Sequence, residues 1–120
     1  TNSLGGVFLI EWENFRAILP FGSNPDELVE ISQVAKYQQP AFLLAADHGY
    51  APANPPEWIN KLNPQFIVIT VDSADPDGLP NQEFLDAVEG YPLLRTDRHG
   101  WIEITTDGRQ IWVSTENSTS

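Results

Sequence analysis

Apolar residues are concentrated in short runs near the middle of the chain. Residues 42–45 and 66–71 are almost wholly apolar, and a helix-length segment at 54–62 separates them. Runs without alternation are typical of strands covered on both faces, so we expect two parallel neighbouring strands joined by a helix. The strands lead into Asp47-His48-Gly49 and Asp72-Ser73, and an open α/β sheet binds its ligands at such carboxyl ends.

The segment before this unit predicts a hairpin and a helix. Residues 7–12 and 15–19 flank Glu13-Asn14, where Asn suits a two-residue turn, so they predict a β-hairpin. A helix is then expected from Pro25 to about Tyr37, capped by Ser23 or Asn24. Its inward positions at helical spacing are Leu28, Ile31, Val34 and Ala35.

The segment after this unit predicts one more helix and three short strands. The helix at 81–90 turns Phe84, Leu85 and Val88 inward, and we expect Asn54 and Asn81 to cap the second and third helices. Asp107-Gly108 is typical of a tight hairpin turn. The three strands are expected at 93–95, 101–105 and 110–114.

Three helices cover only one face of such a sheet, although strands this apolar require cover on both. We therefore expect the second face to be hidden by self-association, by the terminal strands folding back, or by a domain outside this chain. Trp12, Trp58, Trp101 and Trp112 lie in strand or helix patterns and are expected in the core or on sheet faces.

Composition and charge exclude several classes of function. The 120 residues fit one domain, and the absence of Cys excludes disulfides and thiolate metal sites. A net charge of −11, with six scattered basic residues, argues against direct nucleic-acid binding. The longest apolar run is too short to cross a membrane, so we expect no membrane contact. Because no Met is present even at position 1, we expect the chain to be part of a longer polypeptide.

Candidate chemistry is concentrated at Asp47-His48-Gly49. A carboxylate beside an imidazole could bind a divalent cation or hold a proton-transfer pair, with Gly49 allowing a sharp turn. The ordinary alternative is that Asp47 caps the loop and His48 makes a local hydrogen bond.

Two other polar segments favour turns over binding sites. Asp72, Asp75, Asp77 and Glu83 supply oxygen ligands, but Ala and Pro occupy intervening positions that a calcium loop requires for ligands. A solvated turn is therefore the better prediction. In Asp97-Arg98-His99-Gly100, His99 could face a ligand, but the flanking Asp and Gly are ordinary turn chemistry.

Three motifs in this order resemble the carboxyl-terminal half of the metallo-β-lactamase-like domain of ComEC-type DNA-uptake (competence) proteins and related hydrolases. They are the segments 43–49 (Leu-Leu-Ala-Ala-Asp-His-Gly), 62–69 (Leu-Asn-Pro-Gln-Phe-Ile-Val-Ile) and 94–100 (Leu-Arg-Thr-Asp-Arg-His-Gly). The resemblance implies an α/β fold that is a partial metallo-β-lactamase-like sandwich. It would contain a mixed sheet with about three helices, half of an αββα fold, over residues 1–115, with a disordered tail at 116–120.

The resemblance also implies a metal site, from which this chain departs. Family members bind zinc or manganese, yet their main His-x-His-x-Asp-His motif has no counterpart here. Two further ligand positions are occupied by Ser23 and Leu79, so at most Asp47 and His48 remain as metal ligands. Because a catalytic metal needs about three protein ligands, we expect no catalytic residues and no cofactor in this fragment.

The leading hypothesis is a degenerate, catalytically inactive domain fragment that acts as a scaffold or interaction surface. Its expected partner is the other half of its own domain or a second copy of the chain. The alternative is a metal-dependent hydrolase or nuclease half-domain, with zinc or manganese bound mainly by residues upstream. A third hypothesis is an acidic interaction module that does not descend from a metal-binding domain. The sequence leaves the compartment open, and the resemblance points to the soluble domain of a bacterial membrane protein.

Overall fold

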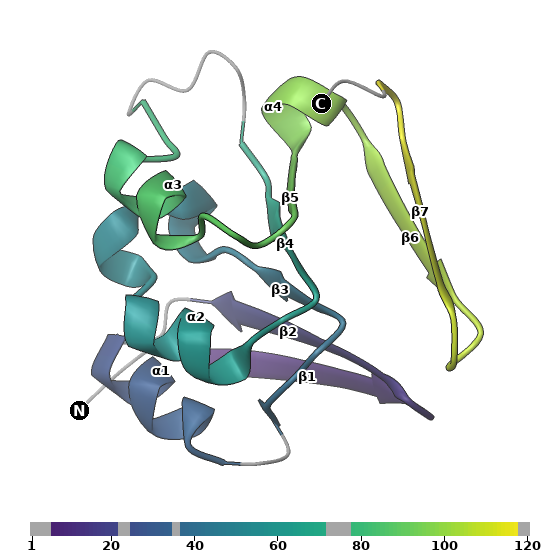
Figure 1. The fold of residues 1–120 in the computed structure, drawn as a ribbon, viewed down its shortest axis with the longest axis horizontal. Coiled ribbons are helices and arrows are strands. Elements are labelled where there is room, and N and C mark those ends of the chain that lie inside the picture. Colours follow the sequence, from purple (N-terminus) through teal and green to yellow (C-terminus); the bar gives the residue numbers. More distant parts are fainter. Residues whose placement is uncertain (1–5, 22–24, 35–36, 72–77, 118–120) are drawn as a thin grey trace.

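A five-stranded β-sheet forms the centre of the protein, with the strand order β1-β2-β3-β4-β5 (Figure 1). The computed structural model describes residues 6–21, 25–34, 37–71 and 78–117. β1 is antiparallel to β2, and β2 to β5 are parallel, which confirms the α/β class and the predicted parallel neighbours. The strands are β1 (Gly6–Trp12), β2 (Phe15–Phe21), β3 (Phe42–Leu44), β4 (Phe66–Ile69) and β5 (Leu93–Arg95).

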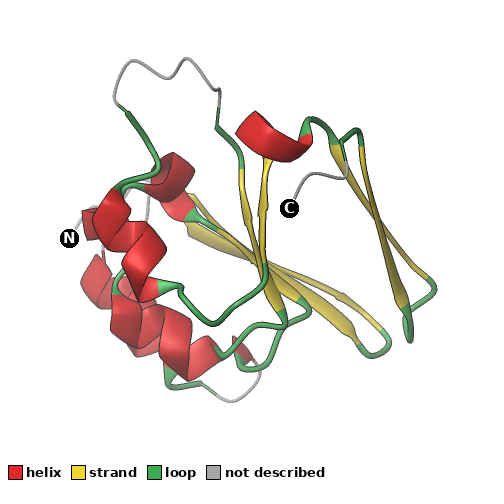
Figure 2. Ribbon diagram, turned by 45° about the horizontal axis from the view of Figure 1, so that its top comes forward, coloured by secondary structure: helices red, strands yellow, loops and turns green. Residues whose placement is uncertain are grey.

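Three helices cover one face of this sheet, as Figure 2 shows: α1 (Pro25–Ser32), α2 (Pro56–Leu62) and α3 (Gln82–Ala87). Each connects two adjacent parallel strands. Because such crossovers are right-handed almost without exception, successive crossovers in one direction place their helices on the same side. Among the described residues, no helix is long and apolar enough to span a bilayer.

The main core lies between these helices and the sheet. Partly buried residues of β1, Val7 and Leu9, pack against its edge. The fully enclosed side chains come from all three helices and from β2, β3 and β4, so the core depends on the crossovers being in place. Its members are Ile18, Leu28, Leu43, Ala45, Trp58, Ile59, Leu62, Ile67, Ile69, Val71, Phe84 and Val88.

Helix α1 is shorter than predicted, ending at Ser32 instead of near Tyr37. The buried Ser32 hydroxyl donates to the Val29 carbonyl within the helix, at 2.6 Å. The Gln38 side chain donates to the Ser32 carbonyl at 2.9 Å and takes the place of the next helical turn. Val34, predicted to face inward, is exposed as a result.

Two predicted helix caps use their side chains elsewhere. Asn81 occupies the N-cap position of α3, but its Oδ1 accepts the Ala51 N–H at 2.7 Å and makes no cap bond. The N-cap of α2 is Pro55, and the Asn54 amide organises the preceding loop. Asn54 therefore bonds to the loop just before α2, and Asn81 joins α3 to a segment 30 residues earlier in the chain.

The sheet face opposite the helices is made entirely of apolar side chains; we call it the open face. Cross-strand register defines it, because residues paired across adjacent strands project to the same side. Its aromatic members include a stacked pair, Phe42 and Phe66, with ring centroids 5.5 Å apart. The open face consists of Phe8, Ile10, Trp12, Phe15, Ala17, Leu19, Phe42, Leu44, Phe66, Val68 and Leu94.

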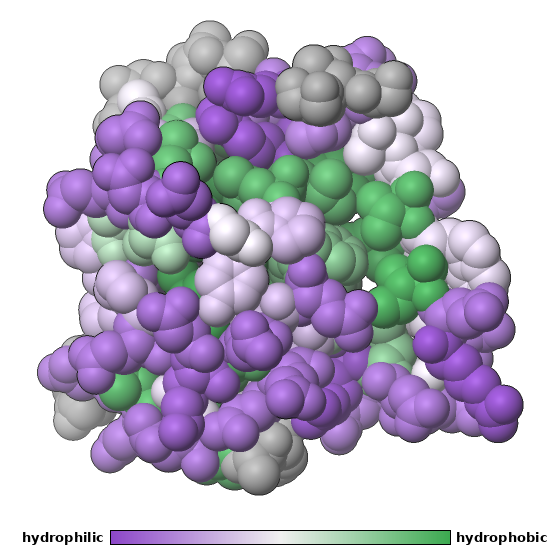
Figure 3. Space-filling model, in the orientation of Figure 1, coloured by the Kyte–Doolittle hydropathy of each residue, from purple (hydrophilic) through white to green (hydrophobic). Residues whose placement is uncertain are grey.

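A second, two-stranded sheet lies on the side of the open face: the hairpin β6 (Ile102–Thr106) and β7 (Ile111–Thr115) (Figures 1 and 2). It follows β5 through a short helix, α4 (Thr96–His99), where the sequence predicted a turn. Ile111 packs against Phe15, Ala17 and Ala41. Figure 3 shows apolar side chains gathered between the five-stranded sheet and this hairpin.

The hairpin leaves part of the open face accessible. Phe8 is 61%, Ile10 49% and Trp12 52% exposed, all on β1. Folding back of the terminal strands, one of the three predicted ways of covering this face, is therefore seen only in part. Trp101 and Trp112 are also exposed, whereas Trp58 is buried as predicted.

Candidate functional site

The predicted site at the end of β3 forms a tight 3₁₀ turn, η2 (Ala46–Gly49). His48 has a φ of 57° and Gly49 a φ of 87°, so the backbone reverses sharply after the strand. A Cβ at Gly49 would lie 2.5 Å from the Pro80 Cβ, so only glycine fits this contact. The Asn81 N–H donates to the Gly49 carbonyl at 3.1 Å, joining the turn to the segment before α3.

His48 is exposed and held in one orientation by the neighbouring strand. Its Nδ1 lies 2.5 Å from the Thr70 carbonyl oxygen, just beyond β4. Because a carbonyl oxygen only accepts, Nδ1 carries the proton, and in the neutral imidazole the lone pair is on Nε2. A backbone carbonyl fixing one imidazole nitrogen is a common way to prepare the other as a ligand or base.

Asn54 organises the loop that carries His48, a role that the sequence did not predict. Its Oδ1 accepts the Ala46 N–H at 2.8 Å, and its Nδ2 donates to the carbonyls of Ala46 at 2.9 Å and Tyr50 at 2.8 Å. Asn54 is only 2% exposed. This buried amide therefore replaces the backbone partners that a strand or helix would supply to the loop.

The structure places the other predicted ligand positions differently. Leu79 is near the turn, one residue before Pro80, but packs against the main core as an apolar residue. Asp47 belongs to the same turn as His48. The side chain of Asp47 lies outside the described part of the structure, and so does Ser23.

Within the residues that the structure describes, no group of three or more His, Cys, Asp or Glu side chains is arranged to hold a metal ion. His48 is one donor, and Leu79 offers none, so these described residues do not fit a complete zinc or manganese site. The predicted solvated turn with Asp72, Asp75 and Asp77 lies outside the described ranges.

The Arg95-Thr96-Asp97 motif makes local structural bonds. Arg95 Nε and Nη2 donate to both carboxylate oxygens of Asp97, at 3.0 and 2.8 Å. The Thr96 hydroxyl donates to the Val71 carbonyl and accepts the Val71 N–H, at 2.8 and 2.7 Å. His99 Nδ1 accepts the Arg95 N–H at 3.1 Å. These bonds fix α4 against the ends of β4 and β5, in agreement with the structural interpretation of His99.

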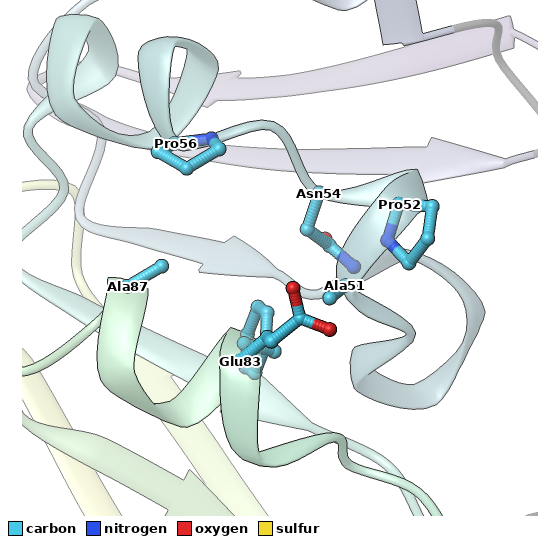
Figure 4. Close-up of a pocket in the computed structure, with 7 residues that line it drawn as sticks. Ala51, Pro52, Asn54, Pro56, Glu83 and Ala87 are labelled. Carbon is cyan, nitrogen blue, oxygen red and sulfur yellow. The ribbon is translucent and has the colours of Figure 1, made fainter.

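A small hollow of about 210 Å³ lies between η3 (Ala51–Ala53), α2 and α3 (Figure 4). Glu83 is the one charged side chain in its lining, and the Asn54 amide is already engaged in the loop. Ligand pockets generally exceed about 300 Å³. We therefore assign no ligand to this hollow, which is lined by Ala51, Pro52, Asn54, Pro56, Glu83, Phe84 and Ala87.

Comparisons with known proteins supply no relative: no family model, curated protein or solved structure matches this chain. The resemblance to ComEC-type metallo-β-lactamase-like domains stays a prediction made from three motifs. Functional proposals for this chain accordingly rest on its own geometry and on these motifs.

Proposed function

We propose that this chain is a non-catalytic half of a metallo-β-lactamase-like sandwich, acting as a scaffold in a ComEC-type DNA-uptake-related protein. One observation carries the proposal: the open face is apolar on all five strands, yet its β1 edge is about half exposed. Its proposed occupant is a second β-sheet from the other half of the same domain.

The physical basis is the requirement of parallel strands for cover on both faces. Burying one Phe or Ile side chain contributes roughly 1.5–3 kcal/mol, so the open face stores a large driving force for association. Contiguous apolar surface of this kind usually marks an interface. Ile111 of the β6–β7 hairpin packs on the face near Phe15 and Ala17, whereas the β1 side chains on this face stay exposed.

The non-catalytic character is supported by what fills the ligand positions. Leu79 is committed to the core, and His48 is the one described donor among the predicted ligands. The acidic surface, with a net charge of −11, also disfavours direct contact with a nucleic-acid polyanion.

Cysteine accessibility tests this proposal, because the chain contains no natural Cys. Ile10→Cys places one thiol on the open face, and Ser114→Cys places one at an exposed position on β7 as a matched control. In the full-length polypeptide, Ile10→Cys should react much more slowly with a thiol reagent than in the 120-residue chain, while Ser114→Cys reacts equally in both.

Equal reactivity of Ile10→Cys in the two contexts would contradict the proposal. Protection that appears in the 120-residue chain only as its concentration rises would identify a second copy as the occupant. Sedimentation analysis of the same samples separates these outcomes.

The hydrolase half-domain is a second candidate, favoured by the orientation of His48. Its imidazole is fixed through Nδ1 and presents Nε2 at the exposed carboxyl edge of the sheet. Other ligands would then come from residues upstream of Thr1. Zinc and manganese analysis with phosphodiesterase assays on the full-length protein tests this candidate. His48→Ala should abolish activity, whereas His99→Ala, which alters a locally bonded imidazole, serves as the control.

A further inference from the structure

Strand β1 is an edge of the sheet with little of the usual protection of edge strands, a single charged side chain at Glu11. Among the described strands it pairs only with β2, and this register runs without a bulge from Gly6–Phe21 to Trp12–Phe15. Its seven residues include no Pro and no Lys. Bulges, Pro and Lys are features with which proteins commonly prevent a further strand from adding to an edge.

The hairpin register shows which backbone groups face outward. Trp12 and Phe15 flank the two-residue turn and exchange backbone hydrogen bonds. Counting back from Trp12, every second residue of β1 therefore points its N–H and C=O groups to β2. The intervening residues, Val7, Leu9 and Glu11, direct their N–H and C=O groups away from the sheet. Those groups form a template for one more strand.

Side chains beside this edge define the chemistry of its partner. On the open face, Ile10 and Trp12 are about half exposed and offer apolar contact. On the other face, Glu11 is the one charged side chain of β1. The nearest cation by register is Arg16, whose guanidinium reaches the Gln39 carbonyl on the side of β3, away from the outer edge.

We infer that the outer edge of β1 binds an extended segment in which apolar residues alternate with Lys or Arg, by strand addition. Apolar side chains of the segment extend the row formed by Ile10 and Trp12, and a basic side chain pairs with Glu11. The net charge of −11 attracts such a segment over a longer range.

A second copy of the chain fits this edge less well. When two copies pair antiparallel with their apolar rows on the same face, odd-numbered residues of one copy face odd-numbered residues of the other. Glu11 then lies opposite Val7, Leu9 or the Glu11 of the second copy. None of these pairings supplies a cation, and both partners carry a net charge of −11.

Binding of a labelled Lys-Val-Lys-Val-Lys-Val-Lys peptide to the 120-residue chain tests the inference, with the Glu-Val counterpart as the control probe. We expect saturable binding of the basic peptide alone, weakened by added salt. Glu11→Lys should raise its Kd by about tenfold. Glu57→Lys, an equal charge change at an exposed position on α2, should leave the Kd nearly unchanged.

Glu11→Pro separates strand addition from simple attraction of charges. It removes one outward N–H without touching the hydrogen bonds to β2, and thermal unfolding verifies that the variant remains folded. We expect it to abolish binding, whereas Glu11→Gln, which removes only the charge, weakens binding by less. If Glu11→Pro fails to fold, the comparison of Glu11→Lys with Glu57→Lys still decides.

Three results would overturn the inference: no saturable binding, equal binding of the Glu-Val peptide, or equal effects of Glu11→Lys and Glu57→Lys. A concentration-dependent dimer that Glu11→Pro abolishes would assign the edge to a second copy instead. Either proposal can fail alone, because the Ile10→Cys experiment reports on cover of the open face in the full-length polypeptide and this one on strand addition to the 120-residue chain.

Discussion

The backbone N–H of Asn14 donates a 2.8 Å hydrogen bond to the carbonyl oxygen of Gly108. This bond joins the β1–β2 turn to the tip of the β6–β7 hairpin, nearly a hundred residues later in the chain. Together with the packing of Ile111, it holds the hairpin on the side of the open face.

Gly108→Ala should strain this contact. Gly108 has a φ of 94°, and a Cβ there would lie 2.6 Å from the Glu13 Oε2. Gly90→Ala is a matched control, because its φ is 101° but its Cβ would meet nothing within 4 Å. We expect a loss in free energy of unfolding of about 1–2 kcal/mol from backbone strain at Gly90 and a larger loss at Gly108. Urea unfolding measures both, and equal losses would show that the tip contact contributes nothing.

Asn54→Ala should destabilise the loop that carries His48. The substitution leaves buried groups of Ala46 and Tyr50 without partners, at an expected cost of about 2–4 kcal/mol. Asn60→Ala removes one exposed bond, to the Tyr91 hydroxyl, and should cost less than about 0.5 kcal/mol. Urea unfolding of both variants checks the difference, and similar values would refute the loop role of Asn54.

Arg95→Lys should destabilise the junction between β5 and α4. Lys cannot reproduce the paired bonds to Asp97, whose side chain is 12% exposed against 13% for Arg95. The expected cost is about 1–3 kcal/mol. Arg98→Lys, at an exposed position three residues later, should change stability by less than about 0.5 kcal/mol. Thermal unfolding that ranked the two variants equally would contradict this role of the ion pair.

Acid should loosen the hairpin tip through Asp107. Backbone N–H groups of Gln110 and Arg109 bond its carboxylate, at 2.8 and 2.9 Å, and hold the pKa of Asp107 below its ordinary value of 3.8. A lowered carboxyl pKa stabilises the folded state above the unfolded-state pKa, and this contribution is lost as pH falls through the folded-state pKa. NMR shifts of the Arg109 and Gln110 amides should report this titration.

Asp107→Asn is the control for that titration. The amide oxygen can accept the same two N–H bonds but does not titrate, so the amide shifts of Arg109 and Gln110 should stay constant below about pH 4. A titration that persists in Asp107→Asn would assign the acid response to another carboxylate.

The strands and tight turns of this fold are predictable because their signals are local. The apolar runs around Leu43 and Ile67 identify buried parallel strands, and both are observed as neighbours. Asp107-Gly108 marks the second hairpin, whose strands begin one residue later than predicted. Alternation and turn chemistry act over a few residues, although the turn predicted at 97–100 is mostly part of helix α4.

The features that sequence reasoning missed depend on distant partners. The end of α1 is set by Gln38 reaching the Ser32 carbonyl, and His48 is oriented by a carbonyl 22 residues away, that of Thr70. The periodicity of α1 and the Asp47-His48 pair contain no information about either partner. The candidate site could therefore be located from sequence at the end of β3, but its hydrogen bonds could not.

The strand order β1-β2-β3-β4-β5 has a consequence for how the chain emerges from the ribosome. Each new strand adds beside the one synthesised just before it, so the sheet can grow vectorially during translation. The β6–β7 hairpin is made after all five strands. Until then the open face lacks the cover that Ile111 supplies, so the five-stranded sheet has to form with one apolar side uncovered.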